Sequence, residues 1–391
     1  MTVLYILIST DPFGGATKSF MALLKGIVQT GIKAVVVVPD TDGIYPTLLD
    51  MNVKVIVQYE KGCTWTGAKT LKQTLLYIPR QLGRMLINYR AQRSLEKKLK
   101  DTDIDIVHSN NSTASLGRYI AERRDLPHIC HIREYGDKDF GLRYFPSNTE
   151  FHRYLKRKDV YSICITKDIQ RHHGLSGHST SRVIYNGIIE GGERTASFQQ
   201  KREHLLYAGR IEPTKGLLKL TTAYNTYLKR MENKSVLPLL VAGEVFDESY
   251  MQRIQEYIVS NHLTEHIRFL GKVNDMSSLY RQAKAIIIPS ENEGFGRCMP
   301  EAMSYGCIAI AHNTGGSKEQ LDNGLALTGK EIGFRYDSTE ELAERLVVLH
   351  DMKTDNIADL QQRAYQSVCQ LYSNTIYIDS VIDFYNSIIK K

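Results

Sequence analysis

Residues 285–303 read AIIIPSENEGFGRCMPEAM, and this stretch decides the fold. An apolar run ends at Pro289, a glycine-bearing loop follows, and a helical segment begins near Pro300. Proline is tolerated in the first turn of a helix because its missing N–H would have no partner there. A strand that leads through a loop into a helix is the unit of a doubly wound sheet, whose ligands bind at the carboxyl ends of the strands. The stretch therefore predicts an open parallel sheet with a ligand site.

The same alternation of apolar runs and helical patterns continues along most of the chain. Short, continuously apolar runs separated by helices are typical of parallel strands that are buried on both faces. The predicted strands are Val3–Ile8, Ala34–Val38, Val53–Val57, Ile104–His108, Ile129–Ile132, Tyr161–Ile165, Leu205–Ala208, Leu237–Ala242, Ile267–Leu270, Ala285–Pro289 and Ile308–Ala311. Since 391 residues exceed what one core usually serves, the pattern predicts two doubly wound, Rossmann-like α/β domains.

The domain boundary falls near a turn. Asn186-Gly187 is a turn dipeptide, and residues 190–200 are polar and without periodicity. We predict an N-terminal domain over 1–185, a hinge or linker over 186–203 and a C-terminal domain over 204–374. Apolar residues at helical spacing predict a terminal helix over 375–391, which we expect to pack back toward the N-terminal domain.

The composition predicts that the protein is cytoplasmic. The six cysteines form no C-x-x-C pair, which argues against a disulfide framework or a zinc site, so we expect no metal. No window approaches ~18 uninterrupted apolar residues. The N-terminal MTVLYILISTDP has no basic residue before its apolar run, so it is interpreted as a strand and not as a signal peptide.

The net charge of +7 is concentrated in residues 69–100, where nine Lys/Arg accompany one acid, Glu96. Apolar residues are interleaved with these basic residues, as in helices that lie on an anionic membrane surface. The alternative is an ordinary domain helix with a solvated basic face. Nucleic acid is not expected as a partner, because no aromatic stacking platform accompanies the charge.

Paired carboxylates mark the first candidate site. Glu293 and Glu301 flank a loop and a helix start, so both can point into one cleft, and carboxylates bind sugar hydroxyls through charge-assisted hydrogen bonds. Gly294 and Gly296 allow the backbone to approach a ligand closely. The alternative is two acids that cap and solvate a loop.

Two further loops carry phosphate-binding features. In Ala208–Gly216, Arg210 and Lys215 place two cations at a helix start, where they would hold a diphosphate together with the helix dipole. Gly14-Gly15 follows the first strand, and its backbone N–H groups could also hold a phosphate. It matches neither a P-loop nor the G-x-G-x-x-G fingerprint.

Polar side chains at two strand ends are candidates for acid–base or acceptor-side roles. His108 and Asn110 end one strand, and His131, Arg133 and Glu134 end the next. A single histidine is more often a structural residue than a catalyst. The histidines do not have metal-ligand spacing.

Together these segments resemble the family 4 retaining glycosyltransferases of the GT-B fold. The strongest likeness lies in 289–319, PSENEGFGRCMPEAMSYGCIAIAHNTGGSKE, with glutamates separated by seven residues. The other matching segments are Gly14-Gly15, Asn186-Gly187-Ile188, Gly209-Arg210, Lys215-Gly216, Val241-Ala242-Gly243 and Phe269-Leu270-Gly271. The resemblance covers nearly the whole chain and is most specific over 205–320.

The resemblance implies a role for each site residue. Arg210 and Lys215 would bind the donor diphosphate and Glu301 the ribose. Glu293, with the backbone of Gly294, Phe295 and Gly296, would orient the donor sugar. Gly14-Gly15 would approach the phosphates from the other domain when the two close. Transfer with retention would proceed without a metal or cofactor, with a UDP-sugar as the default co-substrate and Arg210, Lys215, Glu293, His131 and Glu134 as catalytic candidates.

The chain departs from the family pattern in two places. Many members carry His-Asp or His-Glu where this chain has Arg133-Glu134, which leaves open whether His131, Arg133 or Glu134 faces the sugar. The junction reads Asn-Gly-Ile-Ile in place of the frequent Asn-Gly-Ile-Asp.

The expected acceptor is a saccharide, which could be lipid-linked and held at the inner face of the plasma membrane. Bacterial capsule, exopolysaccharide or wall-glycan assembly would fit this acceptor. The alternatives are a non-catalytic glycosyltransferase-like partner subunit and a GT-B phosphorylase or epimerase.

Overall fold

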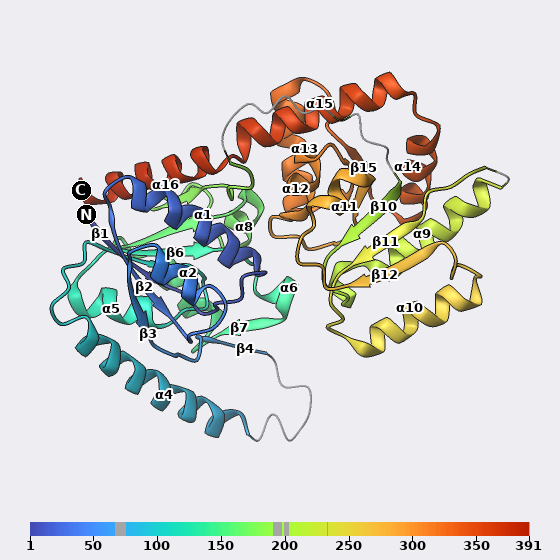
Figure 1. The fold of residues 1–391 in the computed structure, drawn as a ribbon. Helices are drawn as coiled ribbons and strands as arrows, with labels where there is room; N and C mark the ends of the chain where they lie inside the picture. Colours follow the sequence, from blue (N-terminus) through green and yellow to red (C-terminus); the bar gives the residue numbers. More distant parts are fainter. Residues whose placement is uncertain (67–75, 191–197, 199–202, 233, 391) are drawn as a thin grey trace. The chain divides into compact units, whose positions relative to one another are not determined.

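The structure is a computed structural model that describes residues 1–66, 76–190, 198, 203–232 and 234–390. The chain forms two compact units (Figure 1). The first unit joins Met1–Gly187 with Asn374–Lys391, and the second is Ile188–Ser373. The terminal helix is therefore part of the first unit.

The first unit is built on a seven-stranded sheet in the order β3-β2-β1-β5-β6-β8-β9, with every pair parallel. The strands are β1 (Thr2–Ile6), β2 (Lys33–Val38), β3 (Lys54–Val57), β5 (Ile106–Ser109), β6 (His128–Ile132), β8 (Val160–Cys164) and β9 (Ser181–Val183). The strand order reverses between β1 and β5, which makes this the switch point where a doubly wound sheet binds ligands.

Both faces of this sheet are buried, since successive side chains of a strand point to opposite faces. Val3 and Tyr5 enter the core under α1 and α16, whereas Leu4 and Ile6 enter the core under α4 and α5. The covering helices are α1 (Gly15–Gln29), α16 (Asn374–Ile389), α4 (Tyr77–Lys98) and α5 (Leu116–Arg124). The terminal helix thus packs on the N-terminal domain, as predicted.

The remaining elements of the first unit are short. They are α2 (Tyr45–Asp50), β4 (Thr64–Thr66), α6 (Asp137–Phe140), β7 (Leu142–Tyr144), α7 (Asn148–Leu155) and α8 (Lys167–His172). Strands β4 and β7 pair antiparallel to each other, apart from the main sheet.

The second unit contains a six-stranded parallel sheet in the order β12-β11-β10-β13-β14-β15. The strands are β10 (His204–Ala208), β11 (Leu239–Ala242), β12 (Ile267–Gly271), β13 (Ala283–Ile288), β14 (Ile308–His312) and β15 (Phe334–Tyr336). Here the order reverses between β10 and β13. The two doubly wound sheets confirm the predicted fold class.

Helices cover the second sheet as well. They are η1 (Pro213–Lys215), α9 (Leu217–Arg230), α10 (Glu248–Ser260), α11 (Ser277–Gln282), α12 (Cys298–Ser304), α13 (Gly315–Thr328), α14 (Thr339–Asp351) and α15 (Thr354–Leu371). Side chains from α9, α10 and α14 share one core with the strands. None of the helices within the described residues is long and apolar enough to cross a membrane.

The chain passes between the units twice, at 187–188 and at 373–374. Ile188 N donates to Tyr372 O at 2.7 Å, and a β-carbon on Gly187 would lie 2.4 Å from Asn374 Oδ1. The predicted linker over 186–203 overlaps the first crossing, but 191–197 and 199–202 lie outside the described residues.

Candidate functional site

Two loops flank the switch point of the second sheet. Residues 209–216 follow β10, and residues 289–297 follow β13. The loops meet at Gly216, whose φ of +72° favours glycine and where a β-carbon would lie 2.3 Å from Pro289 O. The sequence-predicted residues of both loops are thus gathered at one edge of the sheet.

Lys215 and Glu293 form an ion pair across these loops. Lys215 Nζ lies 2.9 Å from Glu293 Oε2, and each side chain is about one fifth exposed. Burial alone would lower the pKa of Lys215, but the charge and the hydrogen bond of Glu293 outweigh it and raise the pKa above its ordinary value. The lysine therefore presents a fixed positive charge at the switch point.

Arg210 supplies the second cation. Its Nη2 lies 2.8 Å from Glu212 Oε1, and its guanidinium carbon lies 4.9 Å from the centroid of the Phe246 ring. The side chain is 35% exposed, so the positive charge faces solvent at the same edge of the sheet as Lys215. Phe246 is 57% exposed, and its apolar ring is not in the predicted set.

Glu301 lies in the first turn of α12. Arg297 Nε donates to Glu301 Oε1 at 3.2 Å, and Tyr280 OH donates to Glu301 Oε2 at 3.4 Å. These contacts hold the carboxylate at the start of the helix, where its negative charge also complements the helix dipole. Sequence reasoning missed Arg297 and Tyr280, although the i, i+4 spacing of Arg297 and Glu301 is a recognisable signal.

The loop between the glutamates is fixed by its neighbours. Gly296 has φ of +77°, and Gly316 N donates to Glu293 O at 2.7 Å. A β-carbon on Gly316 would lie 2.6 Å from Gly294 O, so the start of α13 lies directly against the loop. Phe295 is 3% exposed and packs edge-on against Tyr372, and its carbonyl accepts a hydrogen bond from Gln320.

In the first unit, Gly14-Gly15 begins α1 beside the switch point of that sheet. Gly14 is the N-cap and has no side chain to cap the helix, and the first turn has no acidic residue. Asn110, which follows β5, donates from Nδ2 to Ala16 O at 3.3 Å. The first turn of α1 thus has no side-chain cap and contacts a second predicted residue.

The two histidines predicted at strand ends are buried on the face that α1 and α16 cover. His108 Nδ1 lies 2.6 Å from Tyr385 OH, and its Nε2 lies 3.2 Å from His131 Nδ1. Both ring nitrogens of His108 are therefore occupied, and its contacts do not support the acceptor-side prediction. Burial, followed by the charge of Arg133, lowers the pKa of both histidines well below the usual value.

Glu134 is also buried. Its Oε1 accepts a hydrogen bond from Ser112 Oγ, which itself lies 2.6 Å from Tyr144 OH. Burial raises the pKa of the Glu134 carboxyl. Its side chain therefore points into the cluster of Ser112 and Tyr144.

Known proteins match both halves of the chain. The family models described as Glycosyltransferase Family 4 and Glycosyl transferases group 1 match residues 13–190 and 193–366. The chain belongs to the family 4 glycosyltransferases.

Curated relatives of this glycosyltransferase are distant. An uncharacterized glycosyltransferase of Methanocaldococcus jannaschii is 25% identical over 63% of this chain and 66% of its own length. The phosphatidyl-myo-inositol mannosyltransferase of Mycobacterium leprae is 22% identical over 78% of this chain and 80% of its own length. The capsular polysaccharide biosynthesis glycosyltransferase CapH of Staphylococcus aureus is 26% identical over 56% of this chain and 62% of its own length.

Solved glycosyltransferases share the fold over nearly the full length. A glycosyltransferase from Rickettsia africae has a TM-score of 0.76 at 18% identity, covering 100% of this chain and 99% of its own. Anabaena HepE, solved with UDP and glucose, has a TM-score of 0.73 at 18% identity, covering 98% of this chain and 99% of its own. The fold of the glycosyltransferase is therefore GT-B.

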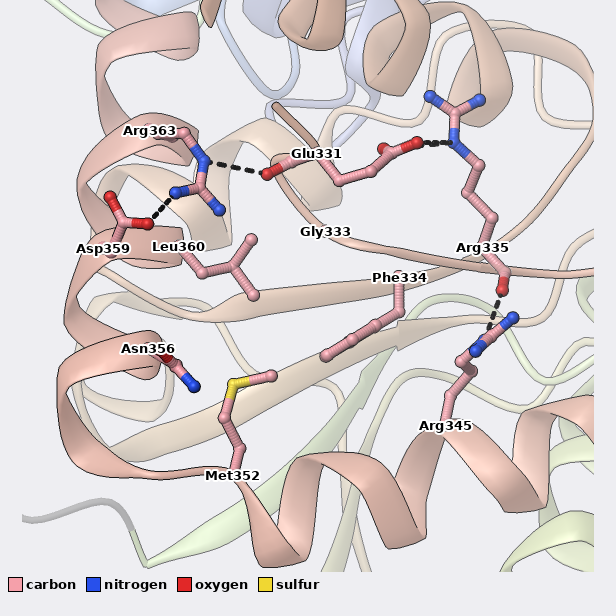
Figure 2. A pocket seen from close by; sticks show the side chains of 10 residues that line it. All are labelled: Glu331, Gly333, Phe334, Arg335, Arg345, Met352, Asn356, Asp359, Leu360 and Arg363. Atoms are coloured by element: carbon pink, nitrogen blue, oxygen red, sulfur yellow. Dashed lines mark hydrogen bonds and ion pairs between the residues drawn. The ribbon is translucent and has the colours of Figure 1, made fainter. Parts of the chain in front are cut away.

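A separate hollow of about 470 Å³ lies between β15, α14 and α15 (Figure 2). Its arginines are held by neighbouring groups of the protein: Arg335 by Glu331, Arg363 by Asp359, and Arg345 by a backbone carbonyl. It contains none of the predicted site residues of the glycosyltransferase, so we do not assign the donor site to it.

Proposed function

We propose that this glycosyltransferase transfers a hexosyl or related group from a nucleotide sugar, with UDP as the default nucleotide, to a saccharide acceptor. The observation that carries the proposal is the arrangement at the switch point of the second sheet. There, Lys215 and Arg210 present two cations beside the paired carboxylates Glu293 and Glu301. Cations suit the diphosphate of a nucleotide sugar, and carboxylates suit its hydroxyl groups.

The proposed division of labour follows from these chemistries. Lys215 and Arg210 stabilise the charge that develops on the leaving diphosphate, which allows transfer without a metal or cofactor. Glu301, oriented by Arg297 and Tyr280, accepts hydrogen bonds from the ribose. Glu293 and the backbone of 294–296 orient the sugar, and Gly14-Gly15 at the start of α1 contributes a further phosphate contact.

We further propose that transfer proceeds with retention of the anomeric configuration. Glu293 is bound by Lys215 and Glu301 by Arg297, and both carboxylates have binding roles in this proposal. Attack from the same face as the departing diphosphate needs charge stabilisation more than a protein nucleophile. The anomeric configuration of the product, measured by NMR, distinguishes retention from inversion.

The alternatives make different demands on the site. A non-catalytic partner subunit would bind nucleotide without turning it over. A GT-B phosphorylase would use inorganic phosphate, and an epimerase would interconvert the nucleotide sugar without an acceptor. The presence of both cations and both carboxylates favours the transferase.

The first experiment is a thermal-unfolding screen with UDP-, GDP-, TDP- and ADP-sugars. A ligand that binds only the folded state stabilises it by about 2.7 kcal/mol when the ligand concentration is one hundred times Kd. The unfolding temperature rises as a result. We expect one nucleotide class to raise it and Glu301→Ala to abolish the rise. The matched control is Glu291→Ala in the same loop, whose partner is the exposed Lys219. No rise with any nucleotide contradicts the proposal.

Helix α4 carries an exposed apolar stripe. Leu82, Met85, Leu86 and Tyr89 follow helical spacing, and each is more than half exposed. The opposite side of the helix packs on the domain through Ala91, Leu95 and Leu99. These four apolar side chains are thus directed to solvent and not into the core.

Basic side chains continue the same exposed side toward the end of α4. Arg90, Arg93 and Lys97 are exposed, and no ion pair in the described part of the chain includes them. Glu96, the acid in this segment, is paired with Arg124 at 3.0 Å. The part of the predicted stretch over 69–75 lies outside the described residues.

We propose that the exposed side of α4 lies on an anionic membrane surface at the cytoplasmic face, where a lipid-linked acceptor of cell-surface polysaccharide assembly is located. An apolar stripe with basic neighbours inserts between headgroups, and each basic residue contributes about 1 kcal/mol near anionic lipid. The relation to a capsular polysaccharide enzyme and to a mannosyltransferase of a phospholipid is consistent with this acceptor class.

Vesicle co-sedimentation tests the membrane proposal. With phosphatidylglycerol vesicles at low salt, we expect Arg90→Glu/Arg93→Glu to weaken binding about 30-fold or more, from the loss of two basic contacts. Leu82→Asp/Leu86→Asp should weaken it at all salt concentrations. Lys33→Glu/Lys229→Glu makes the same change in net charge elsewhere and should leave binding nearly unchanged. Equal binding of all variants contradicts the proposal.

A further inference from the structure

One arginine of the first unit is buried, and none of the described residues supplies it with a carboxylate partner. Arg133 follows β6 and is 9% exposed. Its guanidinium donates to Asn110 O and Asn110 Oδ1 at 2.8 Å each, to Asn186 Oδ1 at 2.8 Å and to His131 Nδ1 at 3.2 Å. All of these acceptors are neutral. A buried charge is costly unless a charge of opposite sign accompanies it.

Two donors of this cluster lack acceptors within the described residues. A guanidinium has five N–H groups, and the bonds to Asn110, Asn186 and His131 use four of them, which leaves one on Nη1. Because a guanidinium only donates, His131 Nδ1 is an acceptor and the ring proton lies on Nε2. That atom is buried and has no hydrogen-bond partner. Within the described residues, the cluster thus has two N–H donors, on Arg133 Nη1 and His131 Nε2, for which no acceptor is present.

Neighbouring groups do not neutralise Arg133. His108 and His131 are neutral at pH 7, because burial, followed by the charge of Arg133 itself, lowers their pKa. The nearest carboxyl in sequence, Glu134, is bound to Ser112 and forms no ion pair with Arg133 within the described residues; burial raises its pKa, although the charge of Arg133 acts in the opposite direction. The positive charge of Arg133 is therefore left for a ligand to compensate.

The cluster lies where a ligand binds in an open sheet. Arg133, Asn110 and Asn186 all follow strands at the carboxyl edge of the first sheet. Asn110 also contacts Ala16 in the first turn of α1, a helix whose N-terminus has no side-chain cap. Arginine is suited to this task because its planar donors match both carboxylate and phosphate.

We propose that Arg133, positioned by Asn110 and Asn186, binds an anionic group, a carboxylate or a phosphate, on the saccharide acceptor. The inference rests on the proposed function and adds to it the charge of the substrate. The carboxylate would belong to an acidic sugar, and the phosphate to a phosphorylated or lipid-phosphate-linked one.

The test measures binding of three sugars to the full chain by ligand-observed NMR. Glucuronate carries a carboxylate, glucose 1-phosphate carries a phosphate, and glucose is the neutral reference. Saturating UDP is present, so that the phosphate-binding residues of the second unit are occupied. We expect one or both anionic sugars to bind at least about 10-fold more tightly than glucose, as a charge-assisted hydrogen bond allows.

Substitutions of Arg133 test whether its side chain recognises the anionic group or only stabilises the fold. Arg133→Gln should remove the preference for the anionic sugar, and Arg133→Lys should keep part of it, since the charge remains. Lys138→Gln, which removes an exposed charge nearby, should change nothing. Equal affinity of the wild type for all three sugars, or an unchanged preference in Arg133→Gln, overturns the inference. UDP binding, measured first on the same samples, reports separately on the proposed function, because Arg133 belongs to the other unit.

Discussion

Lys215→Ala lowers kcat about 10²–10³-fold while the protein stays folded. The loss has this size because removing one preorganised group that stabilises developing charge typically costs that much. The variant also leaves Glu293 without its ion-pair partner at 2.9 Å, so orientation of the sugar is disturbed as well. Initial rates of nucleotide release at saturating donor and acceptor measure the effect.

The control for this prediction is Lys219, in the first turn of α9 and four residues after Lys215, which ends η1. Lys219 is about half exposed and paired with Glu291, outside the group formed by Lys215 and Glu293. Lys219→Ala removes the same charge from the adjacent helix and should keep kcat within about twofold, as expected for an exposed ion pair. A Lys215→Ala enzyme that is as active as Lys219→Ala would show that the cation does not act on the leaving group.

Gly243→Ala should destabilise the second unit by about 1–3 kcal/mol, the usual cost of overpacking. A β-carbon at this position would lie 1.8 Å from Gly209 O, and a backbone oxygen cannot move away as a side chain can. Displacement of Gly209 would also move the adjacent Arg210, so nucleotide affinity should fall with stability. Thermal unfolding with and without UDP measures both effects.

Gly209→Ala is the matched control, because it adds a methyl group on the other side of the same contact. Its β-carbon would meet Tyr207 OH at 3.4 Å, an ordinary contact distance. The unfolding temperature of Gly209→Ala should therefore stay close to that of the wild type. Similar unfolding temperatures for the two variants would refute the packing explanation.

The strands that sequence reasoning found are those buried on both faces. Val36–Val38 and Ile286–Ile288, for example, are continuously apolar because helices cover each side of the sheet. Strands β4, β7, β9 and β15 were not predicted. Each has three residues, and most of their side chains are only partly buried, so no apolar run marks them.

The second-unit site was predictable because its residues are local to two strand–loop–helix units. The contacts of the candidate residues in the first unit could not be predicted in this way. His108 and His131 stand at strand ends in sequence, but alternation directs both toward the core covered by α16, more than two hundred residues away in the chain. No local pattern encodes that contact, nor the contact of Arg133 with Asn186.

The exposed side of α4, for which we propose membrane contact, could not be predicted from local sequence either. The sequence showed that basic and apolar residues alternate over 69–100, but which side chains face solvent depends on where α4 packs. Only the structure shows that Leu82, Met85, Leu86 and Tyr89 are exposed while Leu95 is buried. An ordinary amphipathic helix of a domain would have buried that stripe.

The most direct test of the account compares UDP and UMP binding by calorimetry. The wild type should bind UDP more tightly than UMP, because Arg210 and Lys215 act on the second phosphate. Lys215→Ala should remove most of that difference, whereas Glu301→Ala should weaken both nucleotides by the same factor through the shared ribose. If the wild type binds neither nucleotide, UDP is not the donor nucleotide; if it binds UDP and both variants bind as the wild type does, the donor site does not lie at this switch point.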